Sequence, residues 1–388
     1  MTEADLERRR VLGALVAGGG AACALARLGI SASLAQDAAV GPVPSVPAAE
    51  DLPARPARWY KKLDGARVEC GLCPRKCRVA DMERGACGVR ENRGGEYFTL
   101  VHSRPCSLHL DPVEKKPFFH VLPGTSSMSL ATVGCNFECR FCQNWEIAQA
   151  RPEQVPAADV PPRRLAELAK QYGAPTIACT YTEPVVWGEY VYDIAAAGRK
   201  AGIRTLMISN GYIQPEPMGD LLEVLGAVKV DLKAYTDKFY REACKGELKP
   251  VLDTLRLLRK KGTWTEIVVL VVPTLNDGEQ EHRELARFVV GELGPDVPIH
   301  FTRFHPGYRL MNLPRTPVPT LERARDIAMA EGVRYAYVGN VPGHPGNHTY
   351  CPGCKTVVIE RTGLAVTRNA LIRGKCPGCA REIPGIWS

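Results

Sequence analysis

Short apolar runs alternate with amphipathic stretches along the chain after Met128. The runs are rich in β-branched residues and short, which is typical of buried strands. They comprise residues 130–133, 176–180, 205–208, 227–231, 267–272, 299–304 and 335–338. Between them lie helical patterns with apolar residues at i, i+3, i+4 and i+7. These patterns are Leu165, Leu168, Ala169 and Tyr172, ended by Gly173; Leu221, Leu222 and Leu225; and Leu321, Ala324, Ile327 and Ala328.

This alternation predicts an α/β fold in which a parallel sheet is connected by crossover helices. Both an open doubly wound sheet and a barrel have this rhythm. No G-x-G-x-x-G follows the first run, which disfavours a dinucleotide-binding fold. In a parallel barrel the chemistry lies at the carboxyl ends of the strands. Residues that directly follow the apolar runs are therefore the first candidates for a functional site.

The chain has 388 residues, which corresponds to about two to three domains. With 45% hydrophobic and 24% charged residues it has the composition of a folded protein and not of a disordered one. No uninterrupted run of 18 apolar residues predicts an integral membrane span.

The first 57 residues differ in character from the rest. Residues 1–35 carry Arg8, Arg9 and Arg10 before a Gly/Ala-rich stretch, which resembles a twin-arginine export signal; a solvated tail with a short apolar helix is the alternative. Residues 36–57 contain five prolines and predict a semi-rigid linker, so we expect the ordered protein to begin near Trp59. A functional leader implies export to the periplasm, and an unused one implies the cytoplasm.

Eleven of the 15 cysteines fall into three tight groups. These groups are Cys70, Cys73, Cys77 and Cys87; Cys135, Cys139 and Cys142; and Cys351, Cys354, Cys376 and Cys379. Two-residue spacing lets neighbouring thiolates bind one metal centre, whereas a disulfide across so short a loop is strained. We therefore predict metal sites and no disulfide framework.

The group of three directly follows the first predicted strand. Three thiolates in one short loop can each bind one iron of a [4Fe–4S] cube and leave the fourth iron open. A zinc knuckle completed by a distant residue is the alternative.

The two groups of four suggest closed metal sites. The carboxy-terminal pair of CPGC knuckles has the zinc-ribbon pattern, although rubredoxin-type iron uses similar knuckles. The amino-terminal group is less regular, so zinc is the first interpretation and an auxiliary iron–sulfur cluster is the second. Cys106 is an alternative ligand there.

Several longer motifs resemble one family. The loop CNFECRFC, with Phe141 before its last cysteine, is similar to the signature of the radical S-adenosylmethionine (SAM) superfamily. The runs DPVEKKPFFHVLPG and ATVGCNFECRFCQNWEIAQ resemble AmmeMemoRadiSam system radical SAM enzymes, a branch similar to pyruvate formate-lyase activating enzyme. The resemblance covers residues 58–388. It implies a partial (β/α)6-type TIM barrel over residues 126–342, an amino-terminal metal-binding module over 58–125 and a carboxy-terminal zinc ribbon over 343–388.

The resemblance also implies SAM contacts at the predicted strand ends. Glu183 of TYTEP stands where the family binds the SAM amino group, but the usual glycines before it are absent here. Asp231 and Lys233 alternate across a strand end and so share one face, where an ammonium can bind the SAM carboxylate. The remaining candidates for SAM contacts are Ser209, Asn210, His305 and Asn144. No catalytic base is assigned. A solvated glutamate, a surface ion pair and a structural histidine are the alternatives.

The implied function is that of an oxidoreductase-type enzyme, which reductively cleaves SAM at the cluster and uses the 5′-deoxyadenosyl radical to take hydrogen from a substrate. The implied partners are a flavodoxin- or ferredoxin-like one-electron donor, a protein substrate, and Memo-like and AMMECR-like proteins. A metal-dependent scaffold with vestigial catalysis and an RNA-modifying enzyme are the alternatives.

The net charge of +8 at first suggests nucleic acid as a partner. Two four-thiolate zinc sites and one three-thiolate cluster would lower the formal charge of +8 to about +3. We therefore expect no nucleic-acid partner.

Overall fold

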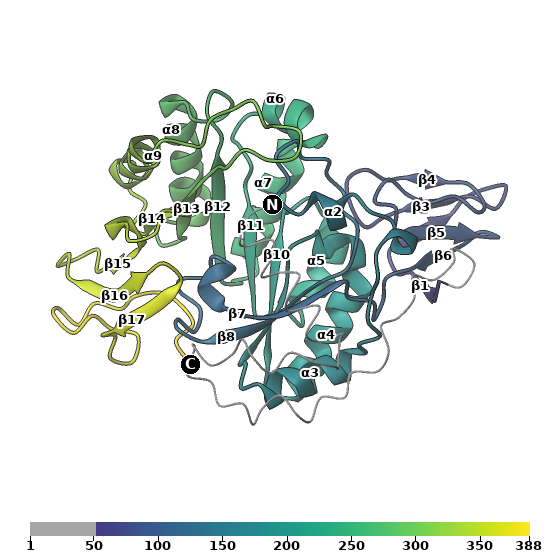
Figure 1. Cartoon of the computed structure of the whole chain (residues 1–388), viewed down its shortest axis with the longest axis horizontal. Helices are drawn as coiled ribbons and strands as arrows, with labels where there is room; N and C mark the ends of the chain where they lie inside the picture. Colours follow the sequence, from purple (N-terminus) through teal and green to yellow (C-terminus); the bar gives the residue numbers. More distant parts are fainter. Residues whose placement is uncertain (1–51) are drawn as a thin grey trace, which may run out of the picture.

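The computed structural model describes residues 52–388. The predicted leader, residues 1–35, and most of the predicted linker, residues 36–57, lie outside the described residues. The centre of the molecule is an eight-stranded sheet in the order β14-β13-β12-β11-β10-β9-β8-β7 (Figure 1). Strands β8 to β14 are parallel and follow one another in chain order, and β7 pairs antiparallel with β8 at the edge.

The seven parallel strands of this sheet overlap the predicted apolar runs. They are β8 (Ser126–Ala131), β9 (Thr176–Cys179), β10 (Arg204–Ser209), β11 (Ala227–Asp231), β12 (Thr265–Val271), β13 (Ile299–Arg303) and β14 (Ala336–Gly339). The antiparallel edge strand β7 (Ser107–Pro112) was not predicted. Because the parallel strands do not reverse their order, the sheet is wound in one direction like a barrel and is not doubly wound. Within residues 52–388, β14 does not pair with β7, so the barrel is open.

A helix occupies each crossover between consecutive parallel strands. The helices are α3 (Pro162–Gln171), α4 (Gly188–Lys200), α5 (Pro215–Leu222), α7 (Leu248–Lys260), α8 (Glu279–Phe288) and α9 (Val318–Ala330). Helix α3 shows why they form: Pro162 begins it, Leu165 and Ala169 bury one face, and Gly173 ends it with a φ of +63°. The core is thus six strand–helix units with β14 as a seventh parallel strand, which agrees with the predicted α/β fold.

The amino-terminal module is smaller than predicted. It consists of two three-stranded sheets, formed by β1 (Arg55–Pro56), β5 (Arg90–Arg93) and β6 (Glu96–Thr99), and by β2 (Tyr60–Lys62), β3 (Val68–Cys70) and β4 (Arg78–Val79). β1 lies inside the predicted linker and pairs with β6. The predicted boundary at residue 125 is wrong, because β7 already belongs to the central sheet.

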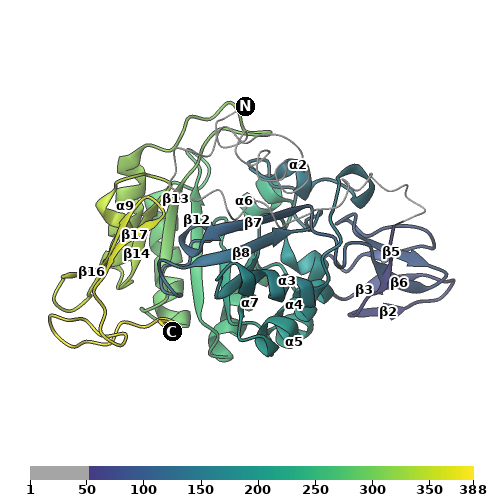
Figure 2. The same cartoon turned by 60° about the horizontal axis from the view of Figure 1, so that its bottom comes forward.

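The carboxy-terminal module lies at the other end of the molecule from the amino-terminal one (Figures 1 and 2). It is a small antiparallel sheet of β15 (Thr349–Tyr350), β16 (Val357–Thr362) and β17 (Ala365–Asn369). No helix in the described part of the chain is long and apolar enough to cross a membrane.

The segment between β7 and β8 is fixed to the sheet by a buried carboxylate. Glu266 on β12 is fully buried and accepts hydrogen bonds from the backbone N–H groups of Phe119 and His120 and from Nε1 of Trp264. Nε2 of His300 lies 2.7 Å from its Oε2. Because Glu266 and His300 are each the second residue of their strand, this network holds Phe119 and His120 near the amino ends of β12 and β13.

Candidate active site

The predicted site residues meet at a cavity of about 480 Å³ at the carboxyl ends of the parallel strands. The predicted residues that line it are Cys135, Cys139, Cys142, Asn144, Glu183, Asn210, Asp231 and Lys233. Side chains from the ends of β8, β9, β10 and β11 therefore face one space. A cavity of this size with a few converging polar groups is typical of a small-molecule site.

The loop that carries Cys135, Cys139 and Cys142 is fastened on several sides. Nε of Arg75 donates to the carbonyl of Asn136 at 2.7 Å, and the N–H of Glu138 donates to the carbonyl of Cys244 at 2.9 Å. The ring of Phe137 lies against Gly246, where a Cβ would be only 2.2 Å from Phe137 Cε1. Only glycine at this position permits so close an approach.

The three loop thiols fit an iron–sulfur cube better than a single ion. Within residues 52–388, only the carboxy-terminal cysteines bring three or more possible ligand atoms within 4.8 Å of one another. The three loop sulfurs therefore do not all lie within 4.8 Å of one another. A cube needs such spacing, because each thiolate binds a different iron. Burial raises the pKa of Cys142 to about 11 and holds that of Cys135 well above its usual range. A hydrogen bond with Cys244, together with burial, raises the pKa of Cys139. Iron binding would therefore displace their protons.

Glu183 is buried and held by three donors. Its Oε1 accepts from Ser209 Oγ at 2.6 Å and from the Val185 N–H at 3.1 Å, and its Oε2 accepts from the Asn210 N–H at 2.8 Å. Burial raises its pKa to about 7, although these hydrogen bonds oppose the shift. A bound ammonium group would favour the ionised form, so the carboxylate suits a cationic ligand.

Asp231 forms ion pairs with two lysines at the end of β11. Its Oδ2 lies 3.1 Å from Nζ of Lys233, as the strand alternation predicts, and its Oδ1 pairs with Nζ of Lys229. Burial favours the neutral acid, but the two ammonium groups outweigh it and hold the pKa of Asp231 at about 2. Lys229 also lines the cavity. It was not predicted, because it lies inside the apolar run of β11 and not at its end.

The other predicted contacts have more varied roles. Asn210 Nδ2 donates to Asn136 Oδ1 at 2.8 Å, which joins the β10 end to the cysteine loop. Asn144 Nδ2 donates to the carbonyl of Tyr181 at 2.8 Å. Ser209 reaches the site through Glu183. His305 does not line the cavity, and burial together with two nearby arginines lowers its pKa.

Sequence reasoning also missed a polar cluster at the cavity wall. Nζ of Lys116 donates to Asp111 Oδ2 at 2.5 Å and to the Tyr181 hydroxyl at 3.0 Å, and this hydroxyl also donates to Asp111. Burial lowers the pKa of Lys116 to about 8 despite the attraction of Asp111. Tyr181 has a φ of +66°, unusual for a bulky residue. The charged run DPVEKK beside apolar residues was the available signal.

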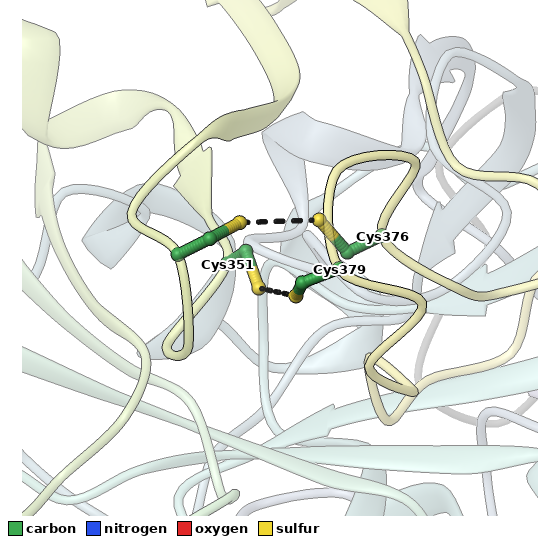
Figure 3. A group of neighbouring side chains, drawn as sticks. Cys351, Cys376 and Cys379 are labelled. Atoms are coloured by element: carbon green, nitrogen blue, oxygen red, sulfur yellow. Dashed lines mark hydrogen bonds between the residues drawn. The ribbon is translucent and has the colours of Figure 1, made fainter.

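The carboxy-terminal cysteines form a compact group. Their four sulfur atoms all lie within 4.8 Å of one another, with 3.6 Å between Cys351 and Cys379 and 3.5 Å between Cys354 and Cys376. Figure 3 shows three of these side chains pointing toward one another. Zn–S bonds of about 2.3 Å at tetrahedral angles separate the sulfurs by about 3.8 Å. The group could therefore hold one tetrahedral ion, and all cysteines in the described residues are free thiols.

Comparisons with known proteins found a matching family model and several similar proteins. Residues 129–286 match the model of the Radical SAM superfamily. Uncharacterized protein MJ0808 of Methanocaldococcus jannaschii is 46% identical over 307 residues, 79% of this chain and 91% of that protein. Pyruvate formate-lyase 1-activating enzyme of Escherichia coli is 26% identical over 179 residues, 44% of this chain and 71% of that enzyme. A radical SAM methyltransferase structure from Sphaerobacter thermophilus aligns at 15% identity with a TM-score of 0.46, covering 74% of this chain and 76% of that chain.

Proposed function

The chain belongs to the radical SAM superfamily and is an enzyme, and on this premise we propose that it cleaves SAM in the cavity at the strand ends. The observation that most directly supports this proposal is that the three loop thiols, Glu183 and Lys233 line one cavity. In this proposal the thiols hold three irons of a [4Fe–4S] cluster. When bound, the reduced cluster and SAM supply a 5′-deoxyadenosyl radical that takes hydrogen from a substrate.

The chain's own residues bind and orient in this proposal. Glu183 faces the SAM amino group, and the donors on its carboxylate keep it in place. Lys233 faces the SAM carboxylate, and Asp231 orients its ammonium group. Burial of these groups excludes water from the reacting atoms.

We further propose a protein substrate and a flavodoxin- or ferredoxin-like electron donor. The support is the likeness to pyruvate formate-lyase 1-activating enzyme, whose name describes the activation of another enzyme. The motifs similar to AmmeMemoRadiSam system enzymes support Memo-like and AMMECR-like partners. We also propose that the carboxy-terminal thiols bind zinc as a structural site, and that residues 1–35 direct export.

The test is anaerobic reconstitution with iron and sulfide, followed by dithionite and SAM. We expect 5′-deoxyadenosine from the wild-type protein and from Cys179→Ala, because Cys179 is a core residue of β9 outside the cavity. Cys139→Ala should give none. Absence of product from cluster-loaded wild-type protein, or full turnover by Cys139→Ala, would refute the proposal.

A further inference from the structure

A second cysteine group lies beside the cluster loop. Cys87 of the amino-terminal module and Cys135 of the loop line the same cavity, of about 780 Å³. We propose that Cys70, Cys73, Cys77 and Cys87 bind a second, redox-active [4Fe–4S] cluster whose four irons are all ligated by protein thiolates. This goes beyond the proposed SAM cleavage, which needs only the loop.

The backbone gathers these four cysteines from two turns. The N–H of Cys70 donates to the carbonyl of Cys77 at 2.9 Å, which joins the ends of the first turn, and the N–H of Lys76 donates to the carbonyl of Cys73 at 3.1 Å. The second turn approaches through Ala86, whose N–H donates to Cys77 Sγ at 3.5 Å. Backbone N–H groups directed at sulfur are one way in which proteins tune iron–sulfur centres.

The spacing of the thiols disfavours a single ion. Among residues 52–388, only the carboxy-terminal cysteines place three or more possible ligand atoms all within 4.8 Å of one another. A tetrahedral zinc site requires sulfurs about 3.8 Å apart. The amino-terminal thiols, like those of the loop, are spaced more widely, as expected where each binds a different iron.

Two buried donors beside these thiols have no partner. The hydroxyl of Tyr97 and Nε of Arg90 make no hydrogen bond, although each residue is only 1% exposed. A Cβ on Gly85 would be 2.9 Å from the Tyr97 hydroxyl and 3.7 Å from Cys77 Sγ, so the hydroxyl lies at the thiol group. Unpaired buried donors are costly. The sulfurs of an anionic cluster would accept from the Tyr97 hydroxyl.

The module also contacts the loop directly. Gly134, just before Cys135, has a φ of +99°, and a Cβ there would be 3.0 Å from the carbonyl oxygen of Cys87. Arg75, between Cys73 and Cys77, donates to two carbonyls, those of Asn136 and Lys245. The second cluster would therefore lie next to the first. It would have no open iron for SAM.

The test separates the two clusters with a Cys135→Ala/Cys139→Ala/Cys142→Ala variant, which leaves the amino-terminal module unchanged. After anaerobic reconstitution we expect about 4 irons and about 4 sulfides per chain in this variant, and about 8 of each in the wild type. Dithionite should add one electron, converting [4Fe–4S]²⁺ to [4Fe–4S]⁺. The resulting electron paramagnetic resonance (EPR) signal should not change when SAM is added.

Adding Cys77→Ala to the loop variant should remove most of the remaining iron. Cys106→Ala is the matched control and should keep it, because the Cys106 thiol donates to the carbonyl of Ala131 at 3.5 Å and does not face the group. Zinc in place of iron in the loop variant would overturn the proposal, as would a wild-type protein with only about 4 irons. Neither result would contradict SAM cleavage at the loop.

Discussion

Replacing Asp231 with Asn tests whether this carboxylate is the counter-charge of the site lysines. The side chains are mostly buried, with exposures of 4% for Lys229, 17% for Lys233 and 25% for Asp231. The pKa of Asp231 is about 2 instead of 3.8. Since one pKa unit equals about 1.4 kcal/mol, the lysines favour the charged form by about 2 kcal/mol more than burial disfavours it.

The asparagine also leaves two ammonium groups with no carboxylate. We expect Asp231→Asn to lower the free energy of unfolding by about 3 kcal/mol, at the lower end of what breaking a buried pair costs, because Asp231 is partly exposed. Lys229→Met/Asp231→Asn removes the more buried cation as well, so it should be less destabilising than the single change. Urea unfolding followed by circular dichroism measures both.

The matched control is Asp253, which forms exposed ion pairs with Lys249 and Arg256; the three side chains are 39%, 82% and 42% exposed. Asp253→Asn should cost less than about 1 kcal/mol. An effect of Asp231→Asn on the free energy of unfolding as small as that of this control would show that Asp231 is not the counter-charge of the lysines. A double variant less stable than the single one would contradict the same role, since it would mean that the ammonium of Lys229 needs no counter-charge.

Three further predictions concern residues that do not line the cavity. Cys376→Ser should release about one zinc ion per chain and cost more than about 2 kcal/mol, measured by metal analysis and urea unfolding; unchanged metal content would contradict the ribbon site. Burial lowers the pKa of His120 to about 4 from its usual 6.5, so its neutral form stabilises the fold above pH 6.5 and this contribution is lost as the pH falls toward 4. Between pH 7 and pH 5 the loss should be about 2 kcal/mol, and His120→Asn should flatten the slope of unfolding free energy against pH by that amount; an unchanged slope would refute the assignment. Glu266→Gln should lower the free energy of unfolding by about 3 kcal/mol, because the buried donors around it lose a charged acceptor. Glu216 is exposed, so Glu216→Gln should change this free energy by less than about 0.5 kcal/mol. Equal effects of the two substitutions would contradict the hydrogen-bond network of Glu266.

The parallel core could be predicted from sequence because strands buried on both faces are continuous apolar runs. β7 was missed for the opposite reason: its sequence, SLHLDP, is polar at alternate positions and most of its residues are partly exposed. The strands of the amino-terminal module are two to four residues long, too short for any periodicity.

The site residues likewise divide into those that the sequence predicted and those that it did not. Glu183, Asp231 and Lys233 were predictable because each ends an apolar run or lies within three residues after one, and parallel strand ends converge in space. Lys116 was not, because its contact with Tyr181 joins segments 65 residues apart in the chain. His305 satisfies the strand-end rule but does not line the cavity. Position after a strand therefore places a residue at the correct edge, and packing decides whether its side chain faces the site.

The most direct test of the account is the EPR spectrum of the reduced protein before and after SAM is added. SAM that binds in the cavity next to the open iron must change the spectrum of the loop cluster. We predict a SAM-dependent change in the wild type that weakens in Glu183→Gln and is absent when Cys135, Cys139 and Cys142 are replaced by Ala. A wild-type cluster whose spectrum is identical with and without saturating SAM would contradict the central claim.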